Sequence, residues 1–226
     1  NQIKVKNTLK FLTDISGIFR KNINTKIIAI TGSCGKTSLK ELLGNTLKKI
    51  SKASISQRSF NNKYGVPLSL FNLNYNDDYG VLEVGMDKKG EIDNLSKIIK
   101  PNVSVITNIN YAHAKNFNNI KDIALAKSEI IHNTRPKGYI VLNADDRFFK
   151  LHKTIAFKKN LKVISFGIND QKSNICLKNI NRNGKNFLLK IKHDNLKKNF
   201  LISNNFQSNI YNILGAIAVI SIYFDI

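Results

Sequence analysis

The sequence is poor in cysteine and in acidic residues, and each shortage argues against a class of protein. Only two cysteines, Cys34 and Cys176, occur in 226 residues, too few for a disulfide framework. Aspartate and glutamate number 15 against 36 lysines and arginines, so the formal net charge is +21. No stretch interleaves basic residues with aromatics as a base-stacking surface would, and we therefore expect no nucleic-acid partner. A generic solvated surface explains the lysines, with steering of an anionic small molecule as the alternative.

Long hydrophobic runs are also missing. The first apolar stretch, residues 9–19, is interrupted by Lys10 and Asp14, unlike the core of a signal peptide. The apolar stretch 209–224 is shorter than the ~20 residues of a membrane span and contains Asn212, so we expect a buried helix. We expect no membrane partner, a cytoplasmic location and a monomer.

The chain is organised around residues 26–41, which predict a buried strand, a glycine loop and a helix. The apolar run 27–30 is too short for a helix and rich in isoleucine, which favours a strand. Gly32 and Gly35 let backbone N–H groups approach a ligand without an intervening Cβ. Because the following helix directs its N-terminal N–H groups to the same point, the loop favours an anion, most simply a nucleotide polyphosphate.

Lys36, Thr37 and Ser38 complete this loop. The lysine supplies a positive charge for phosphate, and either hydroxyl suits Mg²⁺. The motif is G-x-x-G-K-T, with two residues between the glycines where the usual phosphate loop has four. An ordinary strand-to-helix turn with an exposed lysine is therefore the alternative.

Strands and helices alternate along most of the chain. This alternation predicts an α/β fold with a mostly parallel, doubly wound sheet. After residue 167 short strands joined by Asn/Gly turns predict a small antiparallel extension near the C-terminus. The predicted strands are 27–30, 54–60 (strand and loop), 79–86, 103–106, 139–142, 163–167, 174–180, 187–191 and 200–202, and the predicted helices are 5–19, 37–50, 90–100, 120–134 and 209–224.

We expect two segments in the domain organisation. Residues 1–25 form a lead-in helix and linker, with Thr8 as the helix cap. Residues 26–226 form one nucleotide-binding domain.

Four polar residues stand out near predicted strand ends. Glu83 follows an apolar run, where a carboxylate is well placed to hold Mg²⁺, and the alternative is a solvated glutamate. His113 lies in the loop after strand 103–106 as a candidate metal or phosphate contact. Asp145 and Asp146 are more simply explained as caps of the next helix than as metal or substrate ligands.

Two further stretches leave alternatives open. Asn61 and Asn62 precede a Gly-Val-Pro sequence, which favours a turn, although their amides also suit a ligand. Lys127 lies on a predicted helix, and the residues alone favour a solvated side chain.

Together these motifs resemble the Mur ligase family, and most closely its members that join D-alanyl-D-alanine to a UDP-N-acetylmuramoyl tripeptide. The resemblance spans nearly the whole chain and rests on several motifs in the right order. They are residues 30–38, 61–62 with 65–70, 83–86 with 90–92, 107–109 with 112–113, 126–127 with 129–130, and Asn209 with Asn212.

The resemblance implies an ATP-driven amide ligation through an acyl phosphate, with ATP and Mg²⁺ as cofactors. UDP-MurNAc-peptide and D-Ala-D-Ala would be the substrates. The implied ATP contacts are Gly32, Ser33, Cys34, Gly35, Lys36, Thr37, Ser38, Asn209 and Asn212. The implied metal ligands are Thr37, Glu83, His113 and Lys127 as a carbamate, the catalytic set is Lys36, Glu83, His113 and Lys127, and the substrate contacts are Asn61 and Asn62.

The chain also departs from the family pattern. Ser208 stands where the family has a histidine before Asn209, and Cys34 replaces a more usual polar residue of the loop. We expect the chain to be the central ATP-binding domain, without the family's N- and C-terminal domains. Four alternatives remain. They are a sister amide ligase such as folylpolyglutamate synthase, another muramoyl amino-acid ligase, a nucleotide-binding module without ligase activity, and a basic nucleic-acid-binding protein.

Overall fold

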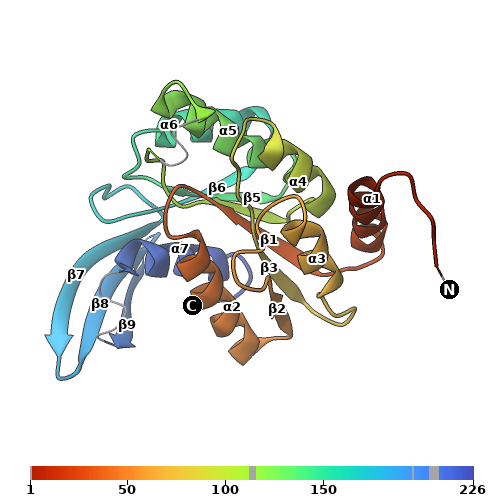
Figure 1. The fold of residues 1–226 in the computed structure, drawn as a ribbon. Helices are drawn as coiled ribbons and strands as arrows, with labels where there is room; N and C mark the ends of the chain where they lie inside the picture. The colour runs from red at the N-terminus through yellow and green to blue at the C-terminus, as the bar shows by residue number, and fades with distance from the viewer. Residues whose placement is uncertain (1, 112–115, 195, 204–208) are drawn as a thin grey trace.

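A single nine-stranded sheet forms the centre of the molecule (Figure 1). The computed structural model describes residues 2–111, 116–194, 196–203 and 209–226. The strands follow the order β2-β3-β1-β4-β5-β6-β7-β8-β9, parallel from β2 to β7 and antiparallel from β7 to β9. They are β1 (Lys26–Thr31), β2 (Ala53–Ile55), β3 (Tyr79–Glu83), β4 (Val103–Ile106), β5 (Tyr139–Asn143), β6 (Lys162–Gly167), β7 (Ile175–Asn183), β8 (Asn186–His193) and β9 (Leu196–Ser203).

Helices cover both faces of the sheet, which confirms the predicted doubly wound α/β fold (Figure 1). Helices α2 and α7 pack on one face, and α3, α4, α5 and α6 pack on the other, which α1 also borders. Their bounds are α1 (Thr8–Lys21), α2 (Lys36–Ile50), α3 (Gly65–Phe71), α4 (Glu91–Ile99), α5 (Ile120–His132), α6 (Phe149–Lys158) and α7 (Ile210–Ile220). Among the described helices, none is long and apolar enough to cross a bilayer.

Strand β1 pairs with β3 on one side and β4 on the other. Its residues alternate between the two helix layers: Ile28 and Ile30 contact the α2/α7 side, whereas Ile27 and Ala29 contact the α4/α5 side. Because the strand order reverses between β1 and β4, their carboxyl ends diverge at the point where open α/β sheets bind ligands. The glycine loop begins there.

The antiparallel extension continues the main sheet. Strands β7, β8 and β9, here called the ribbon, join the parallel part through two residue pairs, Phe166 with Ile175 and Gly167 with Cys176. One of the Asn/Gly turns predicted between the short strands is present at Asn183-Gly184, where Gly184 has a φ of 61°. The ribbon therefore projects beyond the layered body (Figure 1).

Two local predictions were wrong. Helix α1 begins at Thr8, and its cap is Asn7, which is extended and accepts a hydrogen bond from the Lys10 N–H at 2.9 Å. Residues 65–71 form the short helix α3, although the Gly-Val-Pro sequence predicted only a turn. Pro67 lies in the first helical turn, where a missing N–H costs no intrahelical hydrogen bond.

Candidate functional site

The glycine loop needs its glycines for two reasons. Gly32 has a φ of 147° and Gly35 a φ of 82°, backbone conformations that side chains disfavour. A Cβ on Gly32 would lie 1.9 Å from Thr107 Oγ1, and one on Gly35 would lie 2.8 Å from Asn212 Oδ1. The loop is therefore held closely between the segment after β4 and helix α7.

Lys36 is the first residue of α2 and folds back over the loop. Its Nζ donates hydrogen bonds to the carbonyl oxygens of Gly32 at 2.9 Å and Ser33 at 3.3 Å. The ammonium group thus lies beside the helix N-terminus, whose first N–H groups lack partners within the helix. Both features attract an anion.

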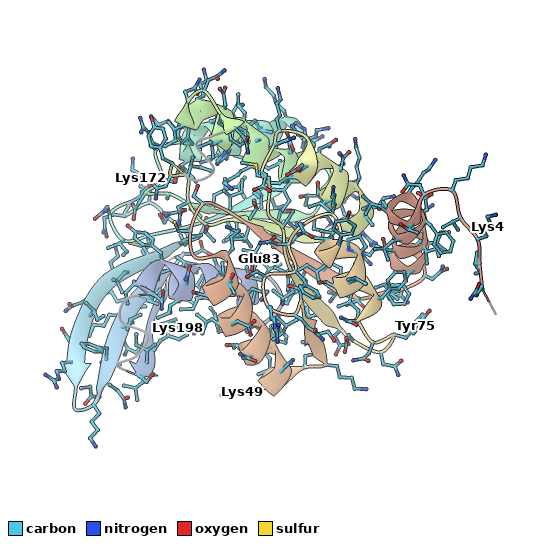
Figure 2. All side chains as sticks on the ribbon, viewed as in Figure 1. Lys4, Lys49, Tyr75, Glu83, Lys172 and Lys198 are labelled. Carbon is cyan, nitrogen blue, oxygen red and sulfur yellow. The ribbon has the colours of Figure 1, made fainter. Side chains whose placement is uncertain are left out.

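The carboxylate of Glu83 lies at the end of β3 and is 1% exposed. Thr37 Oγ1 donates to its Oε2 and Asn61 Nδ2 donates to its Oε1, both at 2.8 Å. Figure 2 shows Glu83 near the middle of the molecule, away from the labelled lysines of the surface. This arrangement excludes the solvated alternative and joins α2 to the loop before α3.

Lys127 lies on α5 and is 1% exposed, although the sequence alone favoured a solvated side chain. Burial, followed by the charge of Lys36, lowers the pKa of its ammonium group to about 7. The family resemblance implied an inward-facing lysine at this position, and its burial agrees with that implication. Its metal-binding role stays a prediction.

Two clefts flank the loop. The first, about 480 Å³, is lined by Lys36, Asn61 and Asn62 together with Met86 and Leu95. The second, about 580 Å³, is lined by Thr37, Ser38, Asn209 and Asn212 together with residues of α2. The adjacent residues Lys36 and Thr37 therefore line different clefts.

The two asparagines before α3 do different things. Asn62 Oδ1 accepts hydrogen bonds from the N–H groups of Tyr64 at 3.1 Å and Gly65 at 3.0 Å, so it shapes the short turn that leads into α3. Asn61 reaches Glu83 as described, and its side chain also fills the space beside Gly85. Both line the first cleft, and their substrate role stays a prediction.

Thr107 and Asn108 hold the glycine loop, a role that the sequence analysis did not find. Asn108 Oδ1 accepts from the Cys34 N–H at 3.0 Å, and Asn108 Nδ2 donates to the Cys34 carbonyl at 3.1 Å. Thr107 Oγ1 donates to the same carbonyl at 2.7 Å. The available signal was a pair of polar residues directly after a buried strand beside β1.

Asp145 and Asp146 do not form a helix cap together, in contrast to our prediction. Asp145 accepts from the N–H groups of residues 168–170 and from Tyr211 Oη at 3.1 Å. Burial alone would raise the pKa of Asp145, but these hydrogen bonds lower it. Asp146 accepts from the N–H groups of Ile109 at 2.7 Å and Phe148 at 2.8 Å, so it supports both the loop after β4 and the entry to α6.

Two predicted positions lie outside the described residues. They are His113 and Ser208, which fall in residues 112–115 and 204–208. Within the described ranges no three His, Cys, Asp or Glu side chains gather as a ready metal site. The Thr37 hydroxyl and the Glu83 carboxylate form a pair of oxygens at the start of α2.

The sheet order and the glycine loop at the start of α2 define an α/β protein of the phosphate-loop type. Residues 30–220 match the Mur ligase middle domain, so the chain belongs to the Mur ligase family.

Two curated relatives and one solved structure illustrate what this chain is similar to. The UDP-N-acetylmuramoyl-tripeptide–D-alanyl-D-alanine ligase of Buchnera aphidicola subsp. Acyrthosiphon pisum is 38% identical over 79% of this chain and 39% of its own length. The ligase of the same name from Buchnera aphidicola subsp. Baizongia pistaciae is 36% identical over 96% of this chain and 47% of its own length. A crystal structure of MurF from Acinetobacter baumannii is 29% identical, with a TM-score of 0.89 over 100% of this chain and 49% of that chain. The chain thus spans less than half the length of these relatives.

Proposed function

We propose that this chain is the ATP-binding domain of an amide ligase that joins D-alanyl-D-alanine to a UDP-N-acetylmuramoyl tripeptide in peptidoglycan precursor synthesis. The observation that carries the proposal is the position of the glycine loop between two clefts, one lined by Lys36 and the other by Thr37. A loop in this position can hold a transferring phosphoryl group between nucleotide and acceptor. The relatives with this name support the choice of substrates.

The nucleotide would occupy the second cleft. Asn209 and Asn212 lie on its wall with Thr37 and Ser38, which suits a base and ribose placed beside the start of α2. The loop N–H groups and Lys36 would then receive the β- and γ-phosphates. Holding the polyphosphate in one geometry is a large part of phosphoryl-transfer catalysis.

Thr37 and Glu83 fit a Mg²⁺ ion. A hydroxyl oxygen and a carboxylate oxygen lie within 2.8 Å of each other, and hard oxygen ligands are those that Mg²⁺ prefers. When bound, the ion would neutralise phosphate charge and stabilise the transferring group. We propose His113 and Lys127 for a second ion.

Lys127 suits this second site only as a carbamate, because an ammonium group repels a cation. Carbamate forms when the neutral amine attacks carbon dioxide at carbon and loses one proton, giving an anionic oxygen ligand. The pKa of about 7 leaves much of the Lys127 amine neutral near pH 7, as this chemistry requires.

The acceptor would enter the first cleft. A carboxylate oxygen of the peptide attacks the γ-phosphorus and ADP leaves, which gives an acyl phosphate. The amine of D-alanyl-D-alanine then attacks the acyl carbon, loses a proton and expels phosphate. Asn61 and Asn62 line this cleft and would contact the muramoyl peptide. The proposal includes a cytoplasmic monomer, completed by domains that account for the rest of the relatives' length.

A coupled assay tests the proposal on the longest natural polypeptide that contains this chain. ADP release should require ATP, the UDP-muramoyl tripeptide and D-alanyl-D-alanine together. Stimulation by a single amino acid, or by a folate with glutamate, would instead indicate a sister ligase. Nucleotide binding without ADP release in any of these mixtures would indicate a module that does not ligate.

A further inference from the structure

Three successive peptide groups of the glycine loop, those between residues 32 and 35, are not all oriented alike. The Ser33 and Cys34 N–H groups donate to the main-chain and side-chain oxygens of Asn108, at 2.9 and 3.0 Å. The carbonyls of the same two peptide groups, those of Gly32 and Ser33, accept from Lys36 Nζ. In the third group the pattern reverses, because the Cys34 carbonyl turns toward Thr107 and Asn108.

The reversal fixes the direction of one amide. In a planar trans peptide the C=O and N–H bonds point in opposite directions. Since the Cys34 carbonyl points toward residues 107 and 108, the N–H of Gly35 points away from them. The carbonyls of Gly32 and Ser33 also point away from residues 107 and 108, and on that side of the loop they meet the Lys36 ammonium group. The Gly35 N–H is therefore turned to the cationic side of the loop.

We infer that Asn108, with Thr107, positions the phosphate loop by holding the Cys34 carbonyl, and so directs the Gly35 N–H at the nucleotide phosphate. Asn108 is suited to this task because one amide group satisfies both the N–H and the C=O of Cys34. Ser33 and Asn110 add a second tie, since the Ser33 hydroxyl lies 2.9 Å from both the N–H and the carbonyl of Asn110.

Close packing supports this assignment. Thr107 is 3% exposed, and its hydroxyl occupies the space where a Gly32 Cβ would lie. The left-handed conformation of Gly35, at a φ of 82°, lies next to the reversed peptide. Asn108 and Thr107 are positioning residues, because they act through the loop backbone. The inference rests on the proposed function only in naming a nucleotide phosphate as the anion.

The test compares Asn108→Leu and Thr107→Val with the wild-type chain, and Asn181→Leu serves as the control. Asn181 is an exposed ribbon residue, so its variant repeats the same chemical change away from the loop. Titration calorimetry with Mg-ADP and with pyrophosphate gives the affinities, and amide NMR of glycine-labelled protein follows the Gly35 signal. Loss of one directed donor predicts about ten-fold weaker binding of both anions by Asn108→Leu. The Gly35 amide should shift on binding in the wild type and much less in this variant.

Thr107→Val keeps the shape of the side chain and serves if Asn108→Leu does not fold. Thr107→Val should also lower the affinity for both anions, whereas Asn181→Leu should bind both anions like the wild type. Wild-type affinity and an unchanged Gly35 shift in the folded loop variants would overturn the inference while leaving the proposed function intact. A wild-type chain that binds pyrophosphate but not ADP would overturn the proposed nucleotide site alone. Binding of neither anion would overturn both.

Discussion

At the scale of single residues, Lys36 is the cation closest to the loop carbonyls of Gly32 and Ser33. Lys36→Ala should weaken Mg-ADP binding by about ten-fold or more, because a charged hydrogen bond to phosphate contributes more than a neutral one. Titration calorimetry measures the change. Lys185→Ala, at an exposed position beside the β7–β8 turn, removes the same charge and should bind normally. Unchanged affinity in Lys36→Ala would contradict phosphate binding by this lysine.

Lys127 should make stability depend on pH. Its pKa is about 7 in the fold and 10.5 as the ordinary value, so between these pH values the unfolded chain binds a proton that the folded chain does not. The free energy of unfolding therefore rises with pH in this window, and Lys127→Met lacks that contribution. The free energy of unfolding of Lys127→Met minus that of the wild type should therefore fall by about 2 kcal/mol from pH 7 to pH 9.

Urea unfolding in carbon dioxide-free buffer checks this prediction. Carbon dioxide is excluded so that the amine, and not a carbamate, is titrated. Lys185→Met is the control, since an exposed lysine should give a difference that does not change with pH. Parallel pH curves for wild type and Lys127→Met would contradict a depressed pKa.

Sequence reasoning located some of these residues and missed others for physical reasons. Glu83 was predictable because a carboxylate after an apolar strand falls at the ligand-binding edge of a parallel sheet. The burial of Lys127 was not, because helical spacing does not say which partners cover a lysine. Asn108 was missed because its hydrogen bonds join residues 74 positions apart, and a single sequence does not reveal such pairings.

At the scale of elements, the turn into α2 should tolerate no side chain at Gly35. An alanine there would adopt a φ of 82° and approach Asn212 Oδ1 to 2.8 Å. Gly184 is a matched control, because it has a φ of 61° and no atom of the described residues lies within 4 Å of the position that a Cβ would take. Gly184→Ala should lose about 1–2 kcal/mol of unfolding free energy from backbone strain, and Gly35→Ala should lose more.

Urea denaturation of both variants measures these losses. Gly35→Ala should also abolish Mg-ADP binding at concentrations that saturate the wild type, whereas Gly184→Ala should bind normally. Equal losses of stability would show that α7 does not restrict the loop.

Among the elements, those with a clear hydrophobic period were predictable, and the irregular ones were not. The strand run 27–30 and the helix 37–50 correspond closely to β1 and α2. Helix α3 was not predicted, because it has only seven residues and contains a Gly-Val-Pro sequence, which is typical of a turn. Its formation depends on packing of Val66 and Leu70 in the core, which local sequence does not encode.

At the scale of the whole molecule, the net charge of +21 should oppose compactness. Lysines lie on widely separated parts of the surface, as Lys4, Lys49 and Lys172 illustrate in Figure 2. Screening should therefore stabilise the fold, and raising sodium chloride from 20 to 500 mM should increase the melting temperature by about 3 °C or more. Scanning calorimetry without ligand measures this shift. A double variant, Lys4→Gln with Lys172→Gln, should respond less, and a fall in melting temperature with salt would contradict the explanation.

The narrow junction between β6 and β7 divides the sheet into two parts, and we expect these parts to differ in the free energy of local unfolding. The central strand β1 is paired along both edges, whereas the ribbon meets the parallel strands through two residue pairs. Deuterium should therefore enter the amides of β8 and β9 by a local opening that leaves β1, β3 and β4 protected. The loop that we propose for phosphate binding follows β1, so it is attached to the part of the sheet that we expect to exchange slowest and should stay in place when the ribbon opens.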